Sequence, residues 1–420
     1  MNKIAIIGGG ASGMMAAITA AKAGASVTIF EKKERIGKKI LATGNGKCNF
    51  SNMYLTDAEY HSNSCHDLMI YFEQFGVKDC ISFFQKLGML IKDKNGYLYP
   101  ASEQASTVLD VLRIALDEYG VTVKVNISDI SIVGKNNKFI LHTKEGSTDF
   151  DKVILCCGSM AGEKSSSKES LKSNKSKTSM KLHLTNQYKH AIDLGHHMVP
   201  IVPALVQLRC KEEFFKAISG VRTDASISLF IDGKFMVKER GEIQLTDYGI
   251  SGIPTFQLSR TAAYAIKEKK NVHILIDFFS DYTEEGLHDL IIERLKNAKN
   301  KTVEEFFVGL LTKKLCMLSM KLGGLKVNEK IKNIDKTKIM QAIQKMKQLK
   351  VTVITTNPFE NAQVCAGGIS MTEVNDHLES KLVPNLYFAG EILDVDGRCG
   401  GYNLQWAWTS GYIAGNEAAK

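Results

Sequence analysis

Residues 3–31, KIAIIGGGASGMMAAITAAKAGASVTIFE, decide the fold of this chain. A short apolar strand at 3–7 is followed by a helix rich in Ala and Met at 11–24 and by a second β-rich strand at 26–30. A strand, a helix and another strand in this order form a βαβ unit, so the sequence predicts an α/β protein.

The turn between the first strand and the helix carries the spacing Gly8-x-Gly10-x-x-Gly13, and Glu31 ends the second strand, 18 residues after Gly13. Gly8 permits a tight turn, Gly10 lets the main chain approach a pyrophosphate, and Gly13 allows the helix to pack closely on the strand. The helix N-terminus offers unpaired N–H groups to that pyrophosphate. Glu31 can accept hydrogen bonds from a ribose diol, so the segment predicts a dinucleotide site.

The charge after the second strand decides which dinucleotide is expected. Lys32, Lys33 and Arg35 could suit a 2′-phosphate, but Glu31 precedes them and would repel one. We therefore expect a free ribose, which leaves FAD or NAD.

The C-terminal part of the sequence favours FAD. The strand-like NLYFAG at 385–390 runs into Glu391, then Gly400 and Gly401, then Asn403 at the start of the last helix. An extended flavin needs such a second region, in which Glu391 could bond ribityl hydroxyls and the helix could aim N–H groups at the edge of the flavin that becomes negative on reduction. Alternatively, Asn403 only caps a core helix.

The middle of the chain predicts a β-rich domain that is inserted into the α/β domain and that itself contains an inserted helical block. Residues 204–246 alternate as β strands with a hairpin turn at Asp232-Gly233, residues 283–347 have the pattern of Lys-rich helices, and the β pattern returns at 350–356. A chain that returns to a β pattern usually re-enters the same sheet. Helices are also expected at 64–75, 79–87, 103–119 and 403–417, and strands at 121–125, on both sides of Asn136-Asn137, at 152–156 and at 385–389.

Composition excludes several classes of protein. The chain has 420 residues, 44% of them hydrophobic, nine dispersed Cys without a CxxC motif, and a net charge of +9. These features predict a soluble, cytoplasmic and reduced protein without a membrane span or a metal site. The Ser/Lys-rich segment 163–181 has the composition of a mobile surface loop; because it lacks aromatic residues that stack on bases, nucleic acid is an unlikely partner.

Three longer stretches resemble one bacterial flavoprotein family. They are IGKKILATGNGKCNFSN (36–52), CAGGISMTEVNDHLESKLVPNLYFAGEILDVDG (365–397) and GGYNLQWAWTSG (400–411), and the match also includes GEIQLTDYGISGIPTFQLSR (241–260). They are similar to the NAD(P)/FAD-dependent oxidoreductases of the aminoacetone oxidase or BaiN type. The resemblance implies a Rossmann-like FAD domain (1–197 and 358–420), an inserted β-barrel-like domain (198–282 and 348–357) and a helical domain (283–347).

The resemblance also implies roles for particular residues. It assigns residues of the 39–49 loop to the approach to the flavin, and residues 391, 401 and 403–405 to the ribityl chain and ring. With the glycine motif and neighbouring positions, the expected FAD-binding residues are Gly8, Gly10, Ala11, Ser12, Gly13, Glu31, Lys32, Lys39, Thr43, Gly44, Asn45, Gly46, Cys48, Asn49, Val125, Gly158, Gly390, Glu391, Gly401, Asn403, Leu404 and Gln405. The chain departs from the family at Lys47, where arginine is usual, and after Gly158, where a glycine-rich stretch is missing.

No second GxGxxG follows a strand, so NAD(P)H is expected as a transient co-substrate that reduces FAD, after which the flavin reduces a small organic substrate. An oxidase that passes electrons from a small amine to oxygen and a flavoprotein that acts on RNA are the alternatives. No catalytic acid or base is assigned: Tyr402 and Cys48 are candidates, packing is the simpler role for Tyr402, and His196 and His197 are expected to be solvated.

Overall fold

The computed structural model describes residues 1–135, 137–162 and 187–420. The Ser/Lys-rich segment 163–181 lies outside the described residues. The chain forms two compact units, one built from Met1–Val202 and Val364–Lys420 and the other from Pro203–Gln363. The first unit therefore contains both ends of the chain, and we describe each unit by itself.

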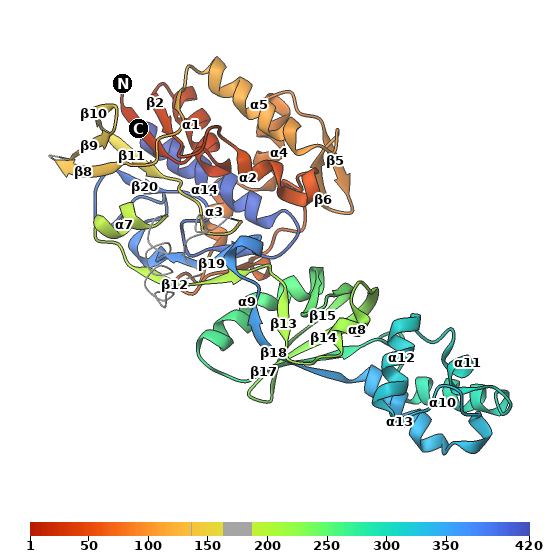
Figure 1. The fold of residues 1–420 in the computed structure, drawn as a ribbon. Helices are drawn as coiled ribbons and strands as arrows, with labels where there is room; N and C mark the ends of the chain where they lie inside the picture. Colours follow the sequence, from red (N-terminus) through yellow and green to blue (C-terminus); the bar gives the residue numbers. More distant parts are fainter. Residues whose placement is uncertain (136, 163–186) are drawn as a thin grey trace. The chain divides into compact units, whose positions relative to one another are not determined.

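A parallel sheet forms the centre of the first unit (Figure 1). Its strands lie in the order β20 (Leu386–Phe388), β11 (Lys152–Leu155), β1 (Lys3–Ile7), β2 (Ser26–Phe30) and β7 (Thr122–Lys124). Ile4, Ile6 and Ile154 are completely buried, because a parallel sheet is covered on both faces. The predicted βαβ unit is confirmed, with Ala5 of β1 opposite Thr28 of β2.

Helices α1 (Ala11–Lys22) and α14 (Tyr402–Ala419), from the two ends of the chain, pack directly against each other (Figure 1). Two glycines of α14 make this close approach possible. A Cβ at Gly411 would lie 2.5 Å from the carbonyl oxygen of Ser12, and one at Gly415 would lie 2.4 Å from that of Ala16. The C-terminal helix is therefore part of the core beneath the glycine turn.

Smaller elements surround this sheet. They are the hairpins β8 (Ser131–Lys135), β9 (Lys138–Thr143) and β10 (Gly146–Phe150); the sheet of β3 (Ser51–Asn52), β5 (Ile91–Lys94) and β6 (Tyr97–Pro100); the pairs β12 (Met198–Ala204) with β19 (Val364–Ile369) and β4 (Tyr60–His61) with β21 (Asp396–Gly397); and the helices α2 (Lys38–Leu41), α3 (Met69–Gln74), α4 (Val77–Lys86), α5 (Ala105–Glu118) and α7 (Lys189–Asp193).

One helix is shorter than the sequence predicted. The helix expected at 64–75 begins only at Met69. Ser62, Asn63 and Ser64 precede it in a loop whose hydroxyl and main-chain N–H groups donate to the buried carboxylate of Asp394, at 2.7 to 3.2 Å. These hydrogen bonds compete with helix formation, as short polar side chains commonly do.

A closed barrel lies in the second unit. Its strands follow the order β13 (Leu208–Cys210), β16 (Gly249–Gly252), β15 (Lys234–Leu245), β14 (Arg222–Ile231), β17 (Val272–Asp277) and β18 (Leu349–Thr356). The Asp232-Gly233 turn between β14 and β15 is confirmed, with φ of 49° and 81°. The chain re-enters the same sheet after the helical block, as predicted, because β18 pairs with β17.

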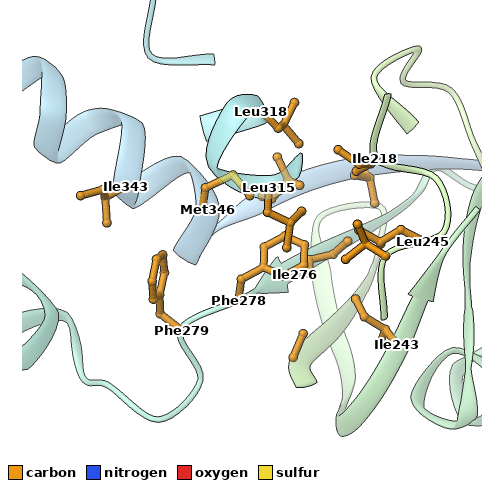
Figure 2. Close-up of a cluster of buried hydrophobic side chains, with 14 of the residues drawn as sticks. Ile218, Ile243, Leu245, Ile276, Phe278, Phe279, Leu315, Leu318, Ile343 and Met346 are labelled. Carbon is orange, nitrogen blue, oxygen red and sulfur yellow. The ribbon is translucent and has the colours of Figure 1, made fainter. Parts of the chain in front are cut away.

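Helices α8 (Phe215–Ile218), α9 (Ile253–Lys267), α10 (Glu284–Lys296), α11 (Val303–Phe307), α12 (Lys313–Leu322) and α13 (Lys336–Lys347) complete this unit. One continuous cluster of buried side chains joins the barrel to the helices. Figure 2 shows Ile276 of β17 and Ile243 of β15 on the barrel side, with Leu315 and Met346 on the helical side. The division at 283–347 into a separate helical domain stays a prediction. No helix in the described part of the chain is both long and apolar enough to cross a membrane.

Candidate nucleotide-binding site

The predicted site residues gather where parallel strands end. Gly8 follows β1, Glu31 follows β2, Val125 follows β7, Gly158 comes shortly after β11, and Gly390 comes shortly after β20. Carboxyl ends of parallel strands lie on the same edge of a sheet. The chain runs from β1 to β2 and β7 on one side and to β11 and β20 on the other, and ligands bind at such a switch point in open α/β sheets.

The three glycines of the turn have different surroundings. Gly8 has a φ of 110°, and a Cβ there would lie 2.3 Å from the carbonyl oxygen of Cys156. A Cβ at Gly13 would lie 1.9 Å from the carbonyl oxygen of Gly8, whereas a Cβ at Gly10 meets nothing within 4 Å. Gly8 and Gly13 are therefore required by the fold, while Gly10 leaves open space in front of the helix.

The main chain at the start of α1 can receive an anion. The first intrahelical hydrogen bond runs from Met14 N to Gly10 O at 3.0 Å. The N–H groups of Ala11, Ser12 and Gly13 lie in the first turn, where an α-helix provides no acceptors. Gly10 precedes these donors and leaves open space at the start of the helix, so a phosphate group could bind there.

Glu31 is held in place by two main-chain donors. Its Oε2 accepts from Gly9 N and its Oε1 accepts from Lys33 N, each at 2.8 Å. A carboxylate oxygen has further lone pairs, so both oxygens can still accept from a ribose. The side chain of the neighbouring Lys32, which was also expected to bind the cofactor, donates from Nζ to Gln187 Oε1 at 3.1 Å.

Hydrogen bonds join the turn at Gly390 to both α1 and α14. Ser12 Oγ donates to Ala389 O at 3.2 Å, and Gly390 N donates to Ser410 Oγ at 2.8 Å. Gly390 has a φ of 80°, and a Cβ there would lie 2.4 Å from Ser12 Oγ. The turn after β20 is therefore in direct contact with the start of α1, which follows the turn after β1.

Two charged residues expected around the flavin bind each other. Lys39 Nζ lies 2.5 Å from Glu391 Oε2, and Glu391 Oε1 accepts from Cys365 N at 2.9 Å. Since one oxygen of Glu391 holds Lys39 and the other holds the main chain, this carboxylate fixes the 39–49 loop to the 390 turn.

The 39–49 loop exposes a left-handed main chain. Gly44, Asn45 and Gly46 have φ of 56°, 53° and 83° and are exposed, and Thr43 Oγ1 donates back to Ile40 O at 2.6 Å. Lys47, which replaces the usual arginine, lies 3.8 Å from Glu103. The loop therefore exposes main-chain groups along its tip.

Cys48 and Asn49 differ in whether their side chains could contact a ligand. Cys48 is completely buried, and burial raises the pKa of its thiol to about 11, so it remains protonated at neutral pH and is a poor nucleophile. Asn49 Oδ1 is buried without a hydrogen-bond partner among the described residues. It lies 2.9 Å from where a Cβ would stand at Gly401.

The start of α14 is arranged differently from the prediction. Gly401, with a φ of 94°, is the N-cap, so Asn403 is not. Asn403 Oδ1 accepts from Gly397 N at 2.8 Å and its Nδ2 donates to Gly397 O at 2.7 Å, which holds the preceding turn. Leu404 packs against the hydrophobic core, and Gln405 is buried with its Oε1 accepting from Ser51 Oγ at 2.6 Å.

Tyr402 is a packing residue. Its ring meets that of Tyr60 edge to face at 5.8 Å between centroids, and its carbonyl accepts from Tyr60 Oη at 3.0 Å. Burial raises the pKa of Tyr402 to about 12, so the phenol stays protonated. It can donate a hydrogen bond but does not act as a base at neutral pH.

Sequence reasoning missed a buried polar cluster. His197 is exposed as expected, but His196 is buried, which corrects the expectation that both are solvated. His196 Nδ1 lies 3.0 Å from Glu373 Oε2, and its Nε2 lies 2.9 Å from Ser380 Oγ. Burial lowers the pKa of His196, although Glu373 acts in the opposite direction. Since these residues are 177 and 184 positions apart, no local pattern could reveal the cluster.

The residues present fit a dinucleotide such as FAD. The open space at Gly10 accepts a group that the protein itself does not fill, and the buried Asn49 Oδ1 lacks a donor. Three separate turns and a helix N-terminus surround this edge of the sheet. Over residues 1–135, 137–162 and 187–420, no group of three or more His, Cys, Asp or Glu side chains could hold a metal ion.

This fold and this site define a Rossmann-type nucleotide-binding protein. The model of the HI0933-like protein Rossmann domain matches residues 2–417, so the chain belongs to the HI0933-like family, in agreement with the sequence resemblance. The family supports FAD as cofactor and an oxidoreductase as the general class.

The similar proteins include two relatives by sequence and one solved structure. The 3-dehydro-bile acid delta(4,6)-reductase of Clostridium scindens is 39% identical, with 100% of both chains covered. The ribosomal RNA dihydrouridine synthase of Haemophilus influenzae is 28% identical over 97% of this chain and 96% of that protein. The solved 3-ketosteroid-delta4-(5alpha)-dehydrogenase from Rhodococcus jostii RHA1 is 13% identical, with a TM-score of 0.49, over 100% of this chain and 97% of that chain.

Proposed function

We propose that this protein is an FAD-dependent reductase that takes hydride from NAD(P)H and reduces an activated carbon–carbon double bond in a small organic substrate. The observation that carries the proposal is the group formed by the first turn of α1, Glu31 and the turn at Gly390, which we call the nucleotide cradle. It lies at the carboxyl ends of the parallel strands, in a chain that is 39% identical over its full length to a named reductase. When bound, FAD supplies the exchange of an electron pair with NAD(P)H and with the substrate.

The chain's own residues would bind and orient the cofactor. The first turn of α1 would hold the pyrophosphate, and Glu31 would accept from the adenosine ribose. Asn49 Oδ1 and the main chain around Gly401 would contact the flavin end, where the N-terminus of α14 favours negative charge. The ion pair of Lys39 and Glu391 would keep the two sides of the site together. The phenol of Tyr402 stays protonated, and no residue is assigned as a catalytic acid.

Anaerobic stopped-flow mixing tests the proposal. NADH or NADPH is expected to bleach the flavin absorbance of the FAD-loaded protein, and an α,β-unsaturated ketone is expected to restore it without oxygen. Flavin that is reduced by a small amine and reoxidised only by oxygen would support the oxidase instead. Flavin that reacts with neither nucleotide would contradict the reductase.

A second candidate function is reduction of a uracil base in RNA, as the name of the Haemophilus influenzae relative suggests for that protein. Like the delta(4,6) reduction, it would saturate a carbon–carbon double bond next to a carbonyl. The concentration of positive charge in residues 283–347 favours this candidate. Detection of dihydrouridine in RNA after incubation with the protein and NADPH tests it.

A further inference from the structure

Most of the net charge of the chain lies in its helical segment. Residues 283–347 contain 14 Lys and Arg against 8 Asp and Glu, a net charge of +6, while the whole chain has +9. A segment that carries two thirds of the net charge in less than a sixth of the residues has a field that attracts anions.

Four of these lysines line one hollow, which we call the lysine hollow. It has a volume of about 530 Å³ and is lined by Lys296, Lys299, Lys301 and Lys330, together with two asparagines and Glu305. All four lysines are exposed. The amide groups of the asparagines add neutral hydrogen-bond donors beside the charges.

Main-chain hydrogen bonds hold these lysines on a fixed frame. Ile331 N donates to Lys301 O at 3.0 Å and Lys332 N donates to Lys299 O at 3.2 Å. Thr302 and Lys330 form an antiparallel bridge between the same two segments. Three of the lysines, Lys299, Lys301 and Lys330, therefore lie on two segments that main-chain hydrogen bonds join.

Three of the four lysines in the hollow form no ion pair within the described chain. Within the described chain, Lys299, Lys301 and Lys330 have no carboxylate within ion-pair distance, whereas Lys296 pairs with Glu293 at 2.8 Å. The one acid that lines the hollow is Glu305, which keeps its negative charge while its Oε2 accepts from Thr302 N at 2.6 Å at the start of α11. With four lysines against one carboxylate, the residues that line the hollow carry a net charge of +3.

We propose that the lysine hollow binds the phosphodiester backbone of RNA. Several ammonium groups on adjoining segments can contact more than one phosphate of the same strand, and such contacts release counterions. The contact does not depend on the proposed reduction, because it lies on the helical segment and requires no flavin chemistry. It gives the protein a site that positions a macromolecule rather than one that reacts with it.

Binding of a fluorescent RNA hairpin to the full FAD-loaded chain, followed by anisotropy at several salt concentrations, tests this proposal. The variant Lys299→Gln, Lys301→Gln, Lys330→Gln removes three charges from the hollow. The control Lys321→Gln, Lys336→Gln, Lys338→Gln removes three exposed lysines elsewhere in the same segment. The hollow variant is expected to bind at least about tenfold more weakly than the control variant, with a salt slope reduced by about 2 to 3.

Several outcomes would overturn the proposal. They are failure of the wild-type chain to bind the hairpin, equal weakening in both variants, and displacement of the hairpin by tripolyphosphate or polyglutamate at matched charge as efficiently as by unlabelled RNA. Unchanged thermal midpoints of both variants show that the comparison concerns binding rather than folding.

Discussion

We propose anion binding both for the nucleotide cradle of the first unit and for the lysine hollow of the second, but the two are made of different groups. The cradle uses main-chain N–H groups at turns where glycines 8, 10 and 13 set the geometry. The hollow uses the ends of flexible side chains on a hydrogen-bonded frame. Sites built from main chain need particular residues at particular spacings, whereas sites built from lysines need only their number and proximity. The first kind is therefore visible in a sequence and the second is not.

The largest effect is expected where glycine is required by packing. Gly13→Val places a side chain 1.9 Å from the carbonyl oxygen of Gly8. The main chain of this turn is held between β1 and α1 and cannot shift without disturbing their packing. We therefore expect a loss of about 3 kcal/mol in the free energy of unfolding and no FAD binding. Urea unfolding and the flavin spectrum measure both. A stable, yellow Gly13→Val protein would show that the turn is not the rigid element of the cradle.

The same substitution three residues earlier provides the matched comparison. Gly10→Val points into open space and has an ordinary φ of −83°, so the apoprotein is expected to keep its thermal midpoint. FAD affinity should fall at least about 100-fold, or about 2.7 kcal/mol, because the side chain fills the space of the pyrophosphate. Gly10→Ala should fall between wild type and Gly10→Val. Normal FAD binding by Gly10→Val would place the cofactor elsewhere.

In the second unit, a large effect is expected from a side chain rather than from a glycine. The buried Lys347 Nζ donates to Asp277 Oδ2 at 2.9 Å, Phe279 O at 3.1 Å and Tyr282 O at 2.7 Å. Lys347→Met removes these three hydrogen bonds and leaves the Asp277 carboxylate without its positive partner, so it should cost about 3 kcal/mol of stability. The exposed Lys338→Met is the control and should change stability by less than about 0.5 kcal/mol. Equal effects of the two substitutions would show that Lys347 does not hold the connection between β17 and α10.

The smallest effect concerns the His196 cluster, which lies in the first unit but is built from side chains. Because burial lowers the pKa of His196, the unfolded chain binds more protons below pH 6.5 than the folded chain does. The contribution of His196 to stability is therefore present above pH 6.5 and decreases as the pH falls toward its lower folded pKa. His196→Gln should lose stability less steeply than wild type between pH 7.5 and 5.5, measured by urea unfolding. Parallel pH curves would contradict this assignment.

The difference between main-chain and side-chain sites also decides which features could be predicted from the sequence. The first two strands, the glycine turn and Glu31 lie within residues 3–31, and their spacing has a geometric meaning, so the sequence was sufficient to predict them. The orientation of Asn403 was not predictable, because its side chain binds the turn at Gly397 instead of capping its own helix. The burial of His196 depends on partners far away in the sequence. The lysine hollow appears only when residues 299–302 and 329–332 are brought together.

Titration of FAD into the apoprotein, followed by flavin fluorescence, tests the central claim most directly. The cradle at the carboxyl ends of β1, β2, β11 and β20 predicts saturable binding of one FAD per chain, with NAD unable to displace it at equal concentration. Saturable binding should disappear in Gly10→Val while the protein remains folded. Absence of saturable FAD binding by the folded wild-type chain, or preference for NAD, would contradict the account.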